Sequence, residues 1–196
     1  LGVGDIIDKL SPTFVSETDV SGVISVSCGN EHTLALTVDN KVFSFGENEN
    51  GQLGINSFND KISPTYIQDS NGNTINNVIS ISSGYSFSLI LNKFGKIFST
   101  GDNTYGQLGN GNGGPGMKQN HFNDIKYSID GVNSANLNKI YNGSNVRAIA
   151  TGDYHMLVLL ENGTVFSSGR NNYGQLGIGS TNDVSELTPV MSDLNS

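Results

Sequence analysis

The 196-residue sequence has no tryptophan, one cysteine and four prolines, and it is short of positive charge. The single thiol, Cys28, excludes a disulfide framework or a cysteine-rich metal site within the chain. Ten basic residues against eighteen acidic ones give a net charge of −8, which argues against a broad phosphate-binding face, so nucleic acid is not an expected partner of this segment. No run of about 18 apolar residues occurs, and no membrane span is predicted.

The amino-terminal residues LGVGDIIDKL lack a basic stretch followed by an apolar core, so they are not expected to act as a signal peptide. We expect a cytoplasmic protein, with the nucleus as the alternative. Cys28 follows Ile24 and Val26 in alternation, which predicts a buried thiol on a strand.

Glycine is the residue that the chain has in excess. It occurs 25 times, nearly twice its average usage of about 7%. The hydrophobic fraction is only 35%, and the apolar runs are short. Many turns between short apolar runs favour an all-β fold.

The glycines mark an internal repeat. Three 26-residue stretches align without a gap, at 29–54, 84–109 and 152–177. Each ends in a similar segment: VFSFGENENGQLG, IFSTGDNTYGQLG and VFSSGRNNYGQLG. The similarity continues upstream in VISVSCG, VISISSG and VRAIATG. Units of about 50 residues that recur at fixed spacing are typical of stacked repeat architectures.

The repeat divides the chain into units. They are expected at 1–22 (the tail of a preceding unit), 23–77, 78–145 and 146–196. Leu1-Gly2 reads as the end of a fourth GQLG, because Pro12 follows Gly2 at the distance at which Pro64 follows Gly54. The Asn- and Gly-rich segment 110–145 lengthens the second unit and is expected to be an inserted surface loop.

Each unit predicts four short antiparallel strands. HTLALT and KVFSFG alternate apolar and polar residues, as half-buried strands do. Between them, Asp-Asn and its equivalents Phe-Gly and Asn-Gly predict a two-residue hairpin turn with positive φ at both positions. VISVSCG adds an inner strand, and the proline segments SPTFV, SPTYI and LTPVM add an outer one. Four-stranded units that stack on one another describe the blades of a β-propeller.

The GxNxxGQLG stretch has a structural explanation. Its first glycine ends a strand, its asparagine holds the following turn by bonding to the backbone, its second glycine allows a positive φ, and its leucine enters the space between blades. The residues assigned these roles are Gly46, Asn48, Gly51, Leu53, Gly101, Asn103, Gly106, Leu108, Gly169, Asn171, Gly174 and Leu176.

GxxH-T-x-A-L, the hairpin and VFSxGxNxxGQLG together resemble the regulator of chromosome condensation repeat family, whose members form propellers, most often of seven blades. The resemblance covers nearly the whole chain apart from 110–145. Three features depart from the family's pattern: Phe87 replaces the usual histidine of the second unit, no tryptophan precedes the strand-ending glycines, and the proline segment is missing or obscured after the second unit. These departures weaken the transfer of any particular activity.

Three units and a stub fill about half of such a ring. We therefore expect the chain to be a fragment of a longer one, with closure of a ring by a second chain as the alternative. An open arc exposes strand edges and the faces of its end blades, which invites association.

The candidate site residues are those that differ among units at a fixed place in the motif. Loops that follow the inner strand and the hairpin gather on one face of a propeller, where partners bind. In nucleotide-exchange members of the family, acidic and histidine side chains of GxxH segments face the small GTPase. The expected partner-binding residues are Glu31, His32, Asp153, His155, Glu47, Asp102 and Arg170. The alternative for the two histidines is a structural bond to the backbone of their own blade.

No catalytic residues, metal ligands or cofactors are predicted. The alternating Asp and Asn of 101–114 lack the glutamate and spacing of a calcium loop, and the repeat explains them without a metal. The sequence therefore favours a protein-interaction scaffold rather than an enzyme. The resemblance implies two alternatives: a guanine nucleotide exchange factor for a Ran-like GTPase, and a chromatin-associated propeller.

Overall fold

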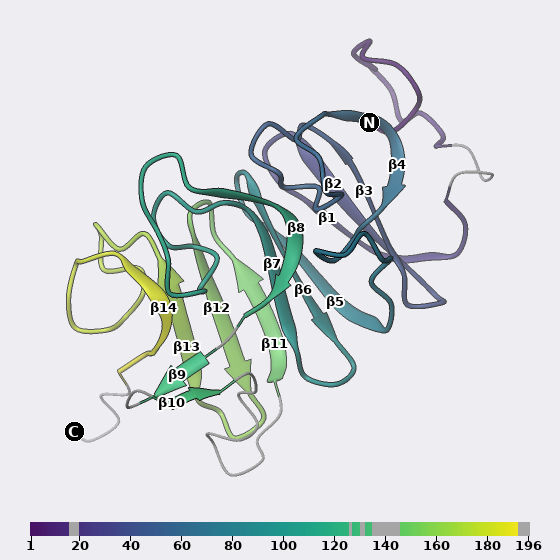
Figure 1. Ribbon diagram of the computed structural model, residues 1–196. Coiled ribbons are helices and arrows are strands. Elements are labelled where there is room, and N and C mark those ends of the chain that lie inside the picture. Colours follow the sequence, from purple (N-terminus) through teal and green to yellow (C-terminus); the bar gives the residue numbers. More distant parts are fainter. Residues whose placement is uncertain (16–19, 126, 130–131, 135–145, 192–196) are drawn as a thin grey trace.

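The computed structural model describes all residues except 16–19, 126, 130–131, 135–145 and 192–196. It is an all-β structure in which three four-stranded antiparallel sheets stack side by side (Figure 1). In each sheet the strands follow chain order from the inner to the outer strand. Among the described residues no helix is long and apolar enough to cross a membrane.

The first blade consists of β1 (Val23–Cys28), β2 (His32–Thr37), β3 (Val42–Gly46) and β4 (Lys61–Tyr66). The second consists of β5 (Val78–Ser83), β6 (Phe87–Asn92), β7 (Ile97–Asp102) and β8 (Lys118–Asp124). The third consists of β11 (Val146–Thr151), β12 (His155–Leu160), β13 (Val165–Gly169) and β14 (Val184–Pro189). A separate two-stranded sheet pairs β9 (Tyr127–Ile129) with β10 (Val132–Ser134). The predicted blades and their four strands are confirmed.

Burial along the second strands shows how the blades pack. Every residue of β6 in the middle blade is buried, because this sheet is covered on both faces. In β12 of the third blade, buried and half-buried residues alternate, since only one face meets a neighbour. Burial of apolar side chains between the sheets supplies the main driving force for stacking.

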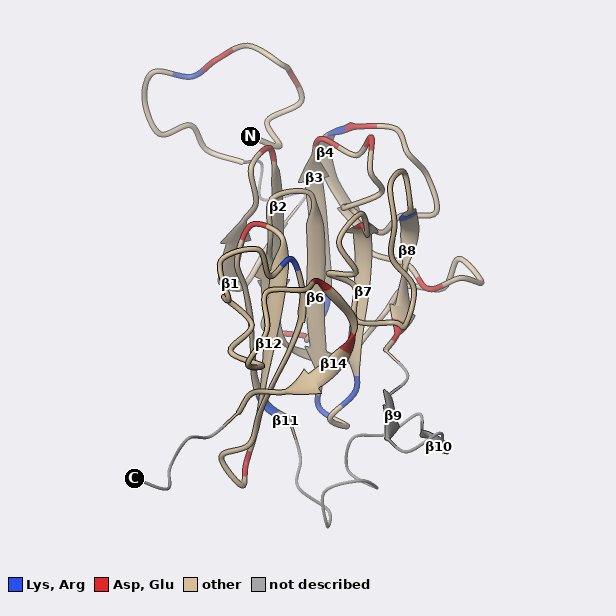
Figure 2. Ribbon diagram, turned by 90° about the vertical axis from the view of Figure 1, so that its left-hand side faces the viewer, with Lys and Arg blue, Asp and Glu red and all other residues tan. Residues whose placement is uncertain are grey.

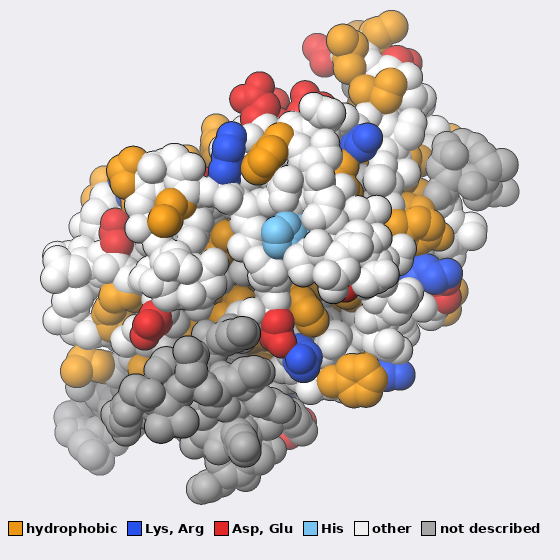
Figure 3. All heavy atoms as spheres, in the orientation of Figure 1, with side chains coloured by type: hydrophobic (Ala, Val, Ile, Leu, Met, Phe, Trp, Pro, Cys, Tyr) orange, Lys and Arg blue, Asp and Glu red, His pale blue; other side chains and the backbone are white. Residues whose placement is uncertain are grey.

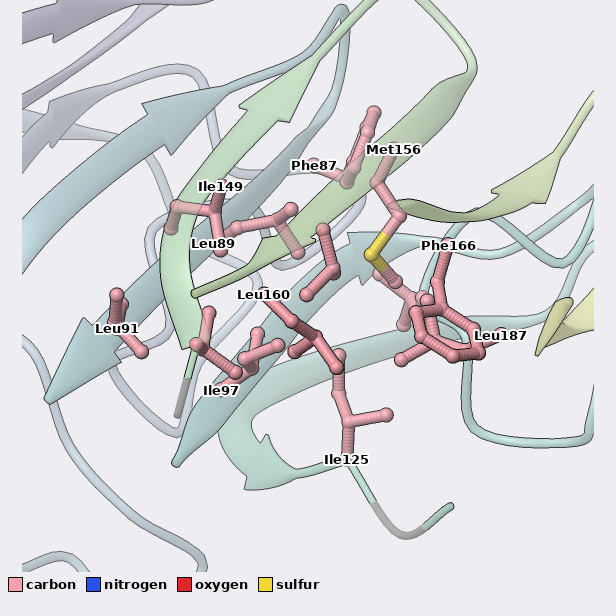
Figure 4. Close-up of a cluster of buried hydrophobic side chains, with 13 residues drawn as sticks. Phe87, Leu89, Leu91, Ile97, Ile125, Ile149, Met156, Leu160, Phe166 and Leu187 are labelled. Atoms are coloured by element: carbon pink, nitrogen blue, oxygen red, sulfur yellow. The ribbon is translucent and has the colours of Figure 1, made fainter. Parts of the chain in front are cut away.

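Two clusters of buried side chains fill the spaces between blades. The first interface contains Leu34, Leu36, Val42, Ile67, Ile75, Val78, Ile90 and Phe122. Thirteen residues from both blades form the second interface, among them Phe87, Leu108, Met156 and Phe166 (Figure 4). Leu53 and Leu108 are completely buried and Leu176 is 1% exposed, as expected for the leucines of GQLG.

The GxNxxGQLG stretch closes the end of each blade in the expected way. Asn48, buried completely, accepts a bond at 3.0 Å from the Leu53 amide and donates its side-chain amide to the carbonyl of Ser57 at 2.8 Å. Gly46 has φ of 109°, and a Cβ built there would lie 2.3 Å from the carbonyl oxygen of Glu31. Only glycine fits both the conformation and this close approach.

A carboxylate completes this turn in two blades and was not predicted. The backbone amide of Asn48 donates to Asp60 Oδ1 at 2.8 Å, and the backbone amide of Asn171 donates to Asp183 Oδ1 at 2.7 Å. In the second blade Asn103 donates instead to the carbonyl of Met117 at 2.8 Å. The longer loop of this blade therefore replaces the carboxylate with a backbone carbonyl.

The hairpin turns differ from the prediction. In the first blade the Thr37 amide bonds to the Lys41 carbonyl, so the loop has three residues rather than two. Only the last residue of each loop has a positive φ: 61° at Asn40, 75° at Gly95 and 87° at Gly163. A three-residue loop that ends in one left-handed residue is the next most common hairpin type, and it tolerates Asp, Phe or Asn at its centre.

Three further expectations are corrected. The segment 110–145 was expected to be an inserted loop, but it contains β8, which pairs with β7 as the outer strand. Its residues 135–145 lie outside the described part of the chain. Residues 11–15, expected as a short strand, have no strand assignment. Cys28 is exposed rather than buried, because the side of the edge strand β1 that carries it is uncovered, as Ile24 and Val26 at 63% and 65% exposure show.

Candidate partner-binding face

Two sets of loops meet at one end of the blades. The loops that follow the inner strands are residues 29–31, 84–86 and 152–154, and the motif turns begin at Glu47, Asp102 and Arg170. Strand register brings them together, since His32 pairs with Gly46, Phe87 with Gly101 and His155 with Gly169. We call this end of the molecule the loop face.

Backbone hydrogen bonds join the two loops within every blade. The amide of Glu47 donates to the carbonyl of Glu31 at 2.8 Å. The equivalent bonds run from Asp102 to Ser86 at 2.9 Å and from Arg170 to Tyr154 at 2.8 Å. The side chains at these paired positions therefore have fixed starting points on a rigid scaffold.

The loops are also joined from blade to blade. The amide of Asn30 donates to the carbonyl of Tyr85 at 3.1 Å, and the amide of Tyr85 donates to the carbonyl of Asp153 at 2.9 Å. These bonds make one continuous rim out of three blades. Inside the rim lies a cavity of about 370 Å³, lined by Cys28, Gly29, Asn30, Ser83, Gly84, Tyr85, Thr151, Gly152 and Asp153.

Five of the seven predicted site residues lie on this face. Glu31 and Asp153 are exposed, and Glu47, Asp102 and Arg170 are half-buried. They do not form a single cluster, since acidic side chains gather on the first blade and Arg170 stands on the third. Figure 3 shows several acidic side chains along the upper edge of the molecule, and Figure 2 marks acidic positions of the ribbon close to β4.

The predicted His32 is instead part of a blade interface. It is 3% exposed, and its Nε2 lies 2.9 Å from Ser88 Oγ of the second blade. Ser88 Oγ donates to the Gln52 carbonyl at 2.8 Å, so Nε2 must carry the proton that the hydroxyl accepts. The bond therefore crosses to the next blade, whereas the structural alternative expected a bond within the same blade.

Burial sets the charge state of both histidines. Desolvation lowers the pKa of His32 from 6.5 to about 4, so the imidazole is neutral near pH 7. His155 is half-buried, and burial lowers its pKa as well, opposed by the charge of Asp153. Neither ring is placed as a charged contact for a partner.

The first blade carries an acidic group made of Glu31, Glu47, Glu49 and Asp60. Partial burial, followed by the charges of the other three carboxylates, raises the pKa of Glu47. Gln52 Nε2 donates to Glu47 Oε2 at 2.9 Å and holds this side chain in place. The acidic group favours a partner that brings positive charge to this blade.

The second and third blades carry a different cluster, made of Tyr85, Tyr105, Tyr154 and Arg170. The ring centroids of Tyr85 and Tyr154 are 5.4 Å apart and stacked, and Tyr105 meets Tyr154 edge-on at 5.4 Å. The Arg170 guanidinium lies 5.0 Å from the centre of the Tyr105 ring and 5.6 Å from that of Tyr154. Arginine and tyrosine are enriched at protein interfaces.

Of this aromatic–arginine cluster, sequence reasoning selected only Arg170 as a site residue. Tyr85 and Tyr154 stand in the variable loops, but they were not assigned to the site. Tyr105 lies inside the GxNxxGQLG stretch of the second blade and meets Arg170 of the third only in space. The available signal was a tyrosine in each of two neighbouring inner-strand loops, 84–86 and 152–154.

The described residues show no group of three or more His, Cys, Asp or Glu side chains able to hold a metal ion. The loop face carries an acidic group, an aromatic–arginine cluster and the open cavity between the inner loops.

Known protein families match this chain along the same repeat. Two sequence profiles, both described as "Regulator of chromosome condensation (RCC1) repeat", match residues 1–36, 39–91 and 162–194 in one case and 23–52, 78–107 and 146–175 in the other. The chain is 34% identical to human Protein RCC2 and covers 38% of its length. It is 32% identical to the mouse E3 ubiquitin-protein ligase HERC2, of which it covers only 4%.

A solved structure shows the same fold. Prp20p from Saccharomyces cerevisiae, described with its binding to Gsp1p and histones, superimposes with a TM-score of 0.62 at 22% identity. The superposition covers 88% of this chain and 39% of Prp20p. The chain thus spans about two fifths of the length of RCC2 and of Prp20p.

Proposed function

The chain belongs to the regulator of chromosome condensation repeat family, and we propose that it acts as a protein-interaction scaffold whose loop face holds another protein. One observation supports this most directly: backbone bonds fix six loops from three blades into one rim, while the side chains on that rim differ from blade to blade. A constant frame with variable contact residues suits recognition and requires no catalytic step.

A pair of charge reversals tests the proposal. Glu31→Lys changes an exposed carboxylate on the loop face, and Glu161→Lys makes the same change in the hairpin at the opposite end of the third blade. Proteins captured by the wild type and quantified by mass spectrometry should be lost with Glu31→Lys and kept with Glu161→Lys. Equal loss with both variants, or no loss with either, would reject the loop face as the binding surface.

A second candidate is nucleotide exchange on a Ran-like GTPase. The similarity to Prp20p and the acidic group of the first blade favour it, since carboxylates near Glu47 would attract a basic surface on the GTPase. The test is the release of a fluorescent GDP analogue from the GTPase. Acceleration by the wild type that disappears with Glu31→Lys would support exchange, and a rate equal to the spontaneous one would rule it out for this segment.

Chromatin association is the third candidate. The net charge of −8 disfavours DNA itself, so contact with basic histone tails is the form that the acidic group would support. Binding of histone H4 tail peptides, measured by fluorescence anisotropy, should weaken with Glu31→Lys. Binding to naked DNA that exceeds binding to the peptide would contradict this reading.

We also propose that a further blade covers the exposed face of β1 in the first one. Ile24 and Val26 stand 63% and 65% exposed on β1, and a large exposed apolar surface favours association. The covering blade belongs either to the rest of the same chain or to a second chain, and a ring of seven blades is the expected closed form. The proposed compartment is the cytoplasm, with the nucleus as the alternative.

A further inference from the structure

The third blade departs from the other two at one position of the loop face. In the first blade Gln52 of GQLG donates its side-chain amide to Glu47 at 2.9 Å, and in the second Gln107 donates to Asp102 at 2.7 Å. The equivalent residue of the third blade is Arg170, which has no acceptor to offer. Gln175 Nε2 there donates to Asn172 Oδ1 at 3.5 Å instead. The third blade therefore lacks the hydrogen bond from the GQLG glutamine to an acidic side chain that the other two blades have.

The Arg170 side chain lies over the aromatic cluster of the two blades. Its guanidinium lies over the rings of Tyr105 and Tyr154, which come from different blades. Tyr85 extends the aromatic surface and is 40% exposed. A guanidinium donates hydrogen bonds in its own plane, so contact with aromatic rings through its face leaves the N–H groups able to bind an acceptor.

The Arg170 guanidinium has no acidic partner in the described part of the chain. The three ion pairs found there involve Lys9, Lys41 and Lys96, and none involves Arg170. Nearby Asp102 is already engaged, since it accepts from Gln107 and from the hydroxyl of Thr104 at 2.6 Å. Arg170 is therefore a half-buried cation with no carboxylate partner among the described residues.

We propose that Arg170 and its tyrosines form a binding site for a carboxylate of a partner protein, carried by an Asp or Glu that stands beside an apolar or aromatic side chain. The fork of the guanidinium binds the two carboxylate oxygens, and the neighbouring side chain packs on the exposed ring of Tyr85. This inference rests on the proposed scaffold function and names one contact of its partner.

The charges around the site favour a carboxylate over a phosphate. Asp153 precedes Tyr154 and is exposed on the same rim, and the acidic group around Glu47 occupies the first blade. A dianionic phosphate meets about twice the repulsion that a carboxylate meets in this field. The same field orients the partner, because its acidic residue is favoured at the third blade and repelled at the first.

The chain offers a simple spectroscopic test, since Arg147 and Arg170 are its only arginines. In ¹⁵N-labelled protein, the peptide acetyl-Gly-Phe-Glu-Leu-Gly-amide should shift the Nε–Hε signal of Arg170 and leave that of exposed Arg147 in place. The same peptide with Gln for Glu should have no effect. Equal shifts with the two peptides, or a larger shift with inorganic phosphate at the same concentration, would overturn the assignment.

Two variants complete the test. Arg170→Glu restores the acidic residue of the other blades and should fold, with a new bond from Gln175; Arg147→Glu makes the same charge change on β11. Arg170→Glu should weaken peptide binding, followed on the Tyr154 amide, at least about tenfold, and Arg147→Glu should not. Equal weakening by both variants would point to net charge instead.

The outcomes also separate this inference from the scaffold proposal. If cellular partners are lost with Glu31→Lys but fully kept with Arg170→Glu, the loop face binds proteins and the carboxylate site is wrong. If neither variant loses a partner, both proposals fail.

Discussion

At the interface between the first two blades a buried imidazole meets a hydroxyl, whereas at the next interface a phenyl ring lies at the imidazole's position and a thioether at the hydroxyl's. His32 and Phe87 occupy the same place, since a Cβ built on the loop glycine of either blade would collide with the ring. Ser88 and Met156 also correspond, because each follows the ring position of its blade by one residue. Phe87 and Met156 are both fully buried in one cluster (Figure 4).

The comparison shows that the fold requires a flat ring over the loop glycine but not a particular chemistry. The polar interface is a relay in which His32 donates to Ser88 and Ser88 donates to the Gln52 carbonyl. At the apolar interface both partners differ, so neither the ring nor the side chain opposite it needs a hydrogen bond. Phe87, taken alone, is a departure from the family pattern; taken with Met156, it is half of a paired substitution.

The largest expected effect comes from breaking this pairing. Phe87→His places an imidazole opposite Met156, where no hydroxyl accepts its proton, and removes apolar contacts from the second interface. We expect a loss of about 4 kcal/mol in the free energy of unfolding, measured by chemical denaturation. A loss below about 1 kcal/mol would mean that Met156 does not define the chemistry of this interface.

The second prediction concerns pH and distinguishes the two interfaces. The pKa of His32 is about 4 in the folded chain and 6.5 when exposed, so the unfolded chain binds the proton first as the pH falls. The stability is fully present above pH 6.5 and is lost between pH 6.5 and 4, by about 3 kcal/mol in all.

The control for this pH dependence copies the apolar interface into the polar one. The double variant His32→Phe/Ser88→Met keeps all carboxylates and His155, so their titration cancels when its unfolding curves are compared with those of the wild type. The extra loss of stability at low pH should occur only in the wild type. If the unfolding free energies of the wild type and the double variant fall in parallel from pH 7 to 4, protonation of His32 does not destabilise the folded chain.

The third prediction sharpens the comparison by rebuilding the relay. Adding Met156→Ser to Phe87→His supplies the missing hydroxyl, with the Gln107 carbonyl in the place that Gln52 has in the first blade. We expect the second substitution to restore about 2 kcal/mol of the loss, although Met156→Ser alone is destabilising. Additive losses in this double-mutant cycle would show that the two positions are not coupled.

Much of the fold was predictable because its signals are local. Alternating strands, the spacing of glycines and Asn48 with its equivalents each act within a few residues, and three ungapped copies reinforced every assignment. The hairpin was wrong in type because Asp39, Phe94 and Asn162 do not adopt the positive φ of a two-residue turn. The outer strand β8 was missed because it pairs through its backbone and lacks the proline that marks β4 and β14.

The site was less predictable because its contacts cross between blades. The sequence identified the variable positions of the rim, and the structure places Glu31, Asp153 and Arg170 there. The sequence alone gives no indication that Tyr105 contacts Arg170, since these residues lie in different copies of one motif. The contact between Phe87 and Met156 was not predicted for the same reason. A repeat alignment compares equivalent positions, not positions that face each other across an interface.

The smallest expected effect is the difference in stability cost between removing two hydroxyls, those of Thr100 and Ser168, which occupy equivalent positions at the two interfaces. Thr100 Oγ1 lies 2.9 Å from the Gly51 carbonyl and 2.8 Å from that of Gln119, so it bonds across or within its blade. Ser168 Oγ is buried beside the modified interface and has no hydrogen-bond partner among the described residues. Thr100→Val should therefore cost about 1 kcal/mol, while Ser168→Ala should be neutral or stabilising by up to about 1 kcal/mol, both measured by chemical denaturation. Each change removes one hydroxyl and keeps the backbone, so the difference reports the bond itself. A cost for Ser168→Ala equal to that for Thr100→Val would mean that the second interface still satisfies this hydroxyl, and that its loss of polar partners is confined to Phe87 and Met156.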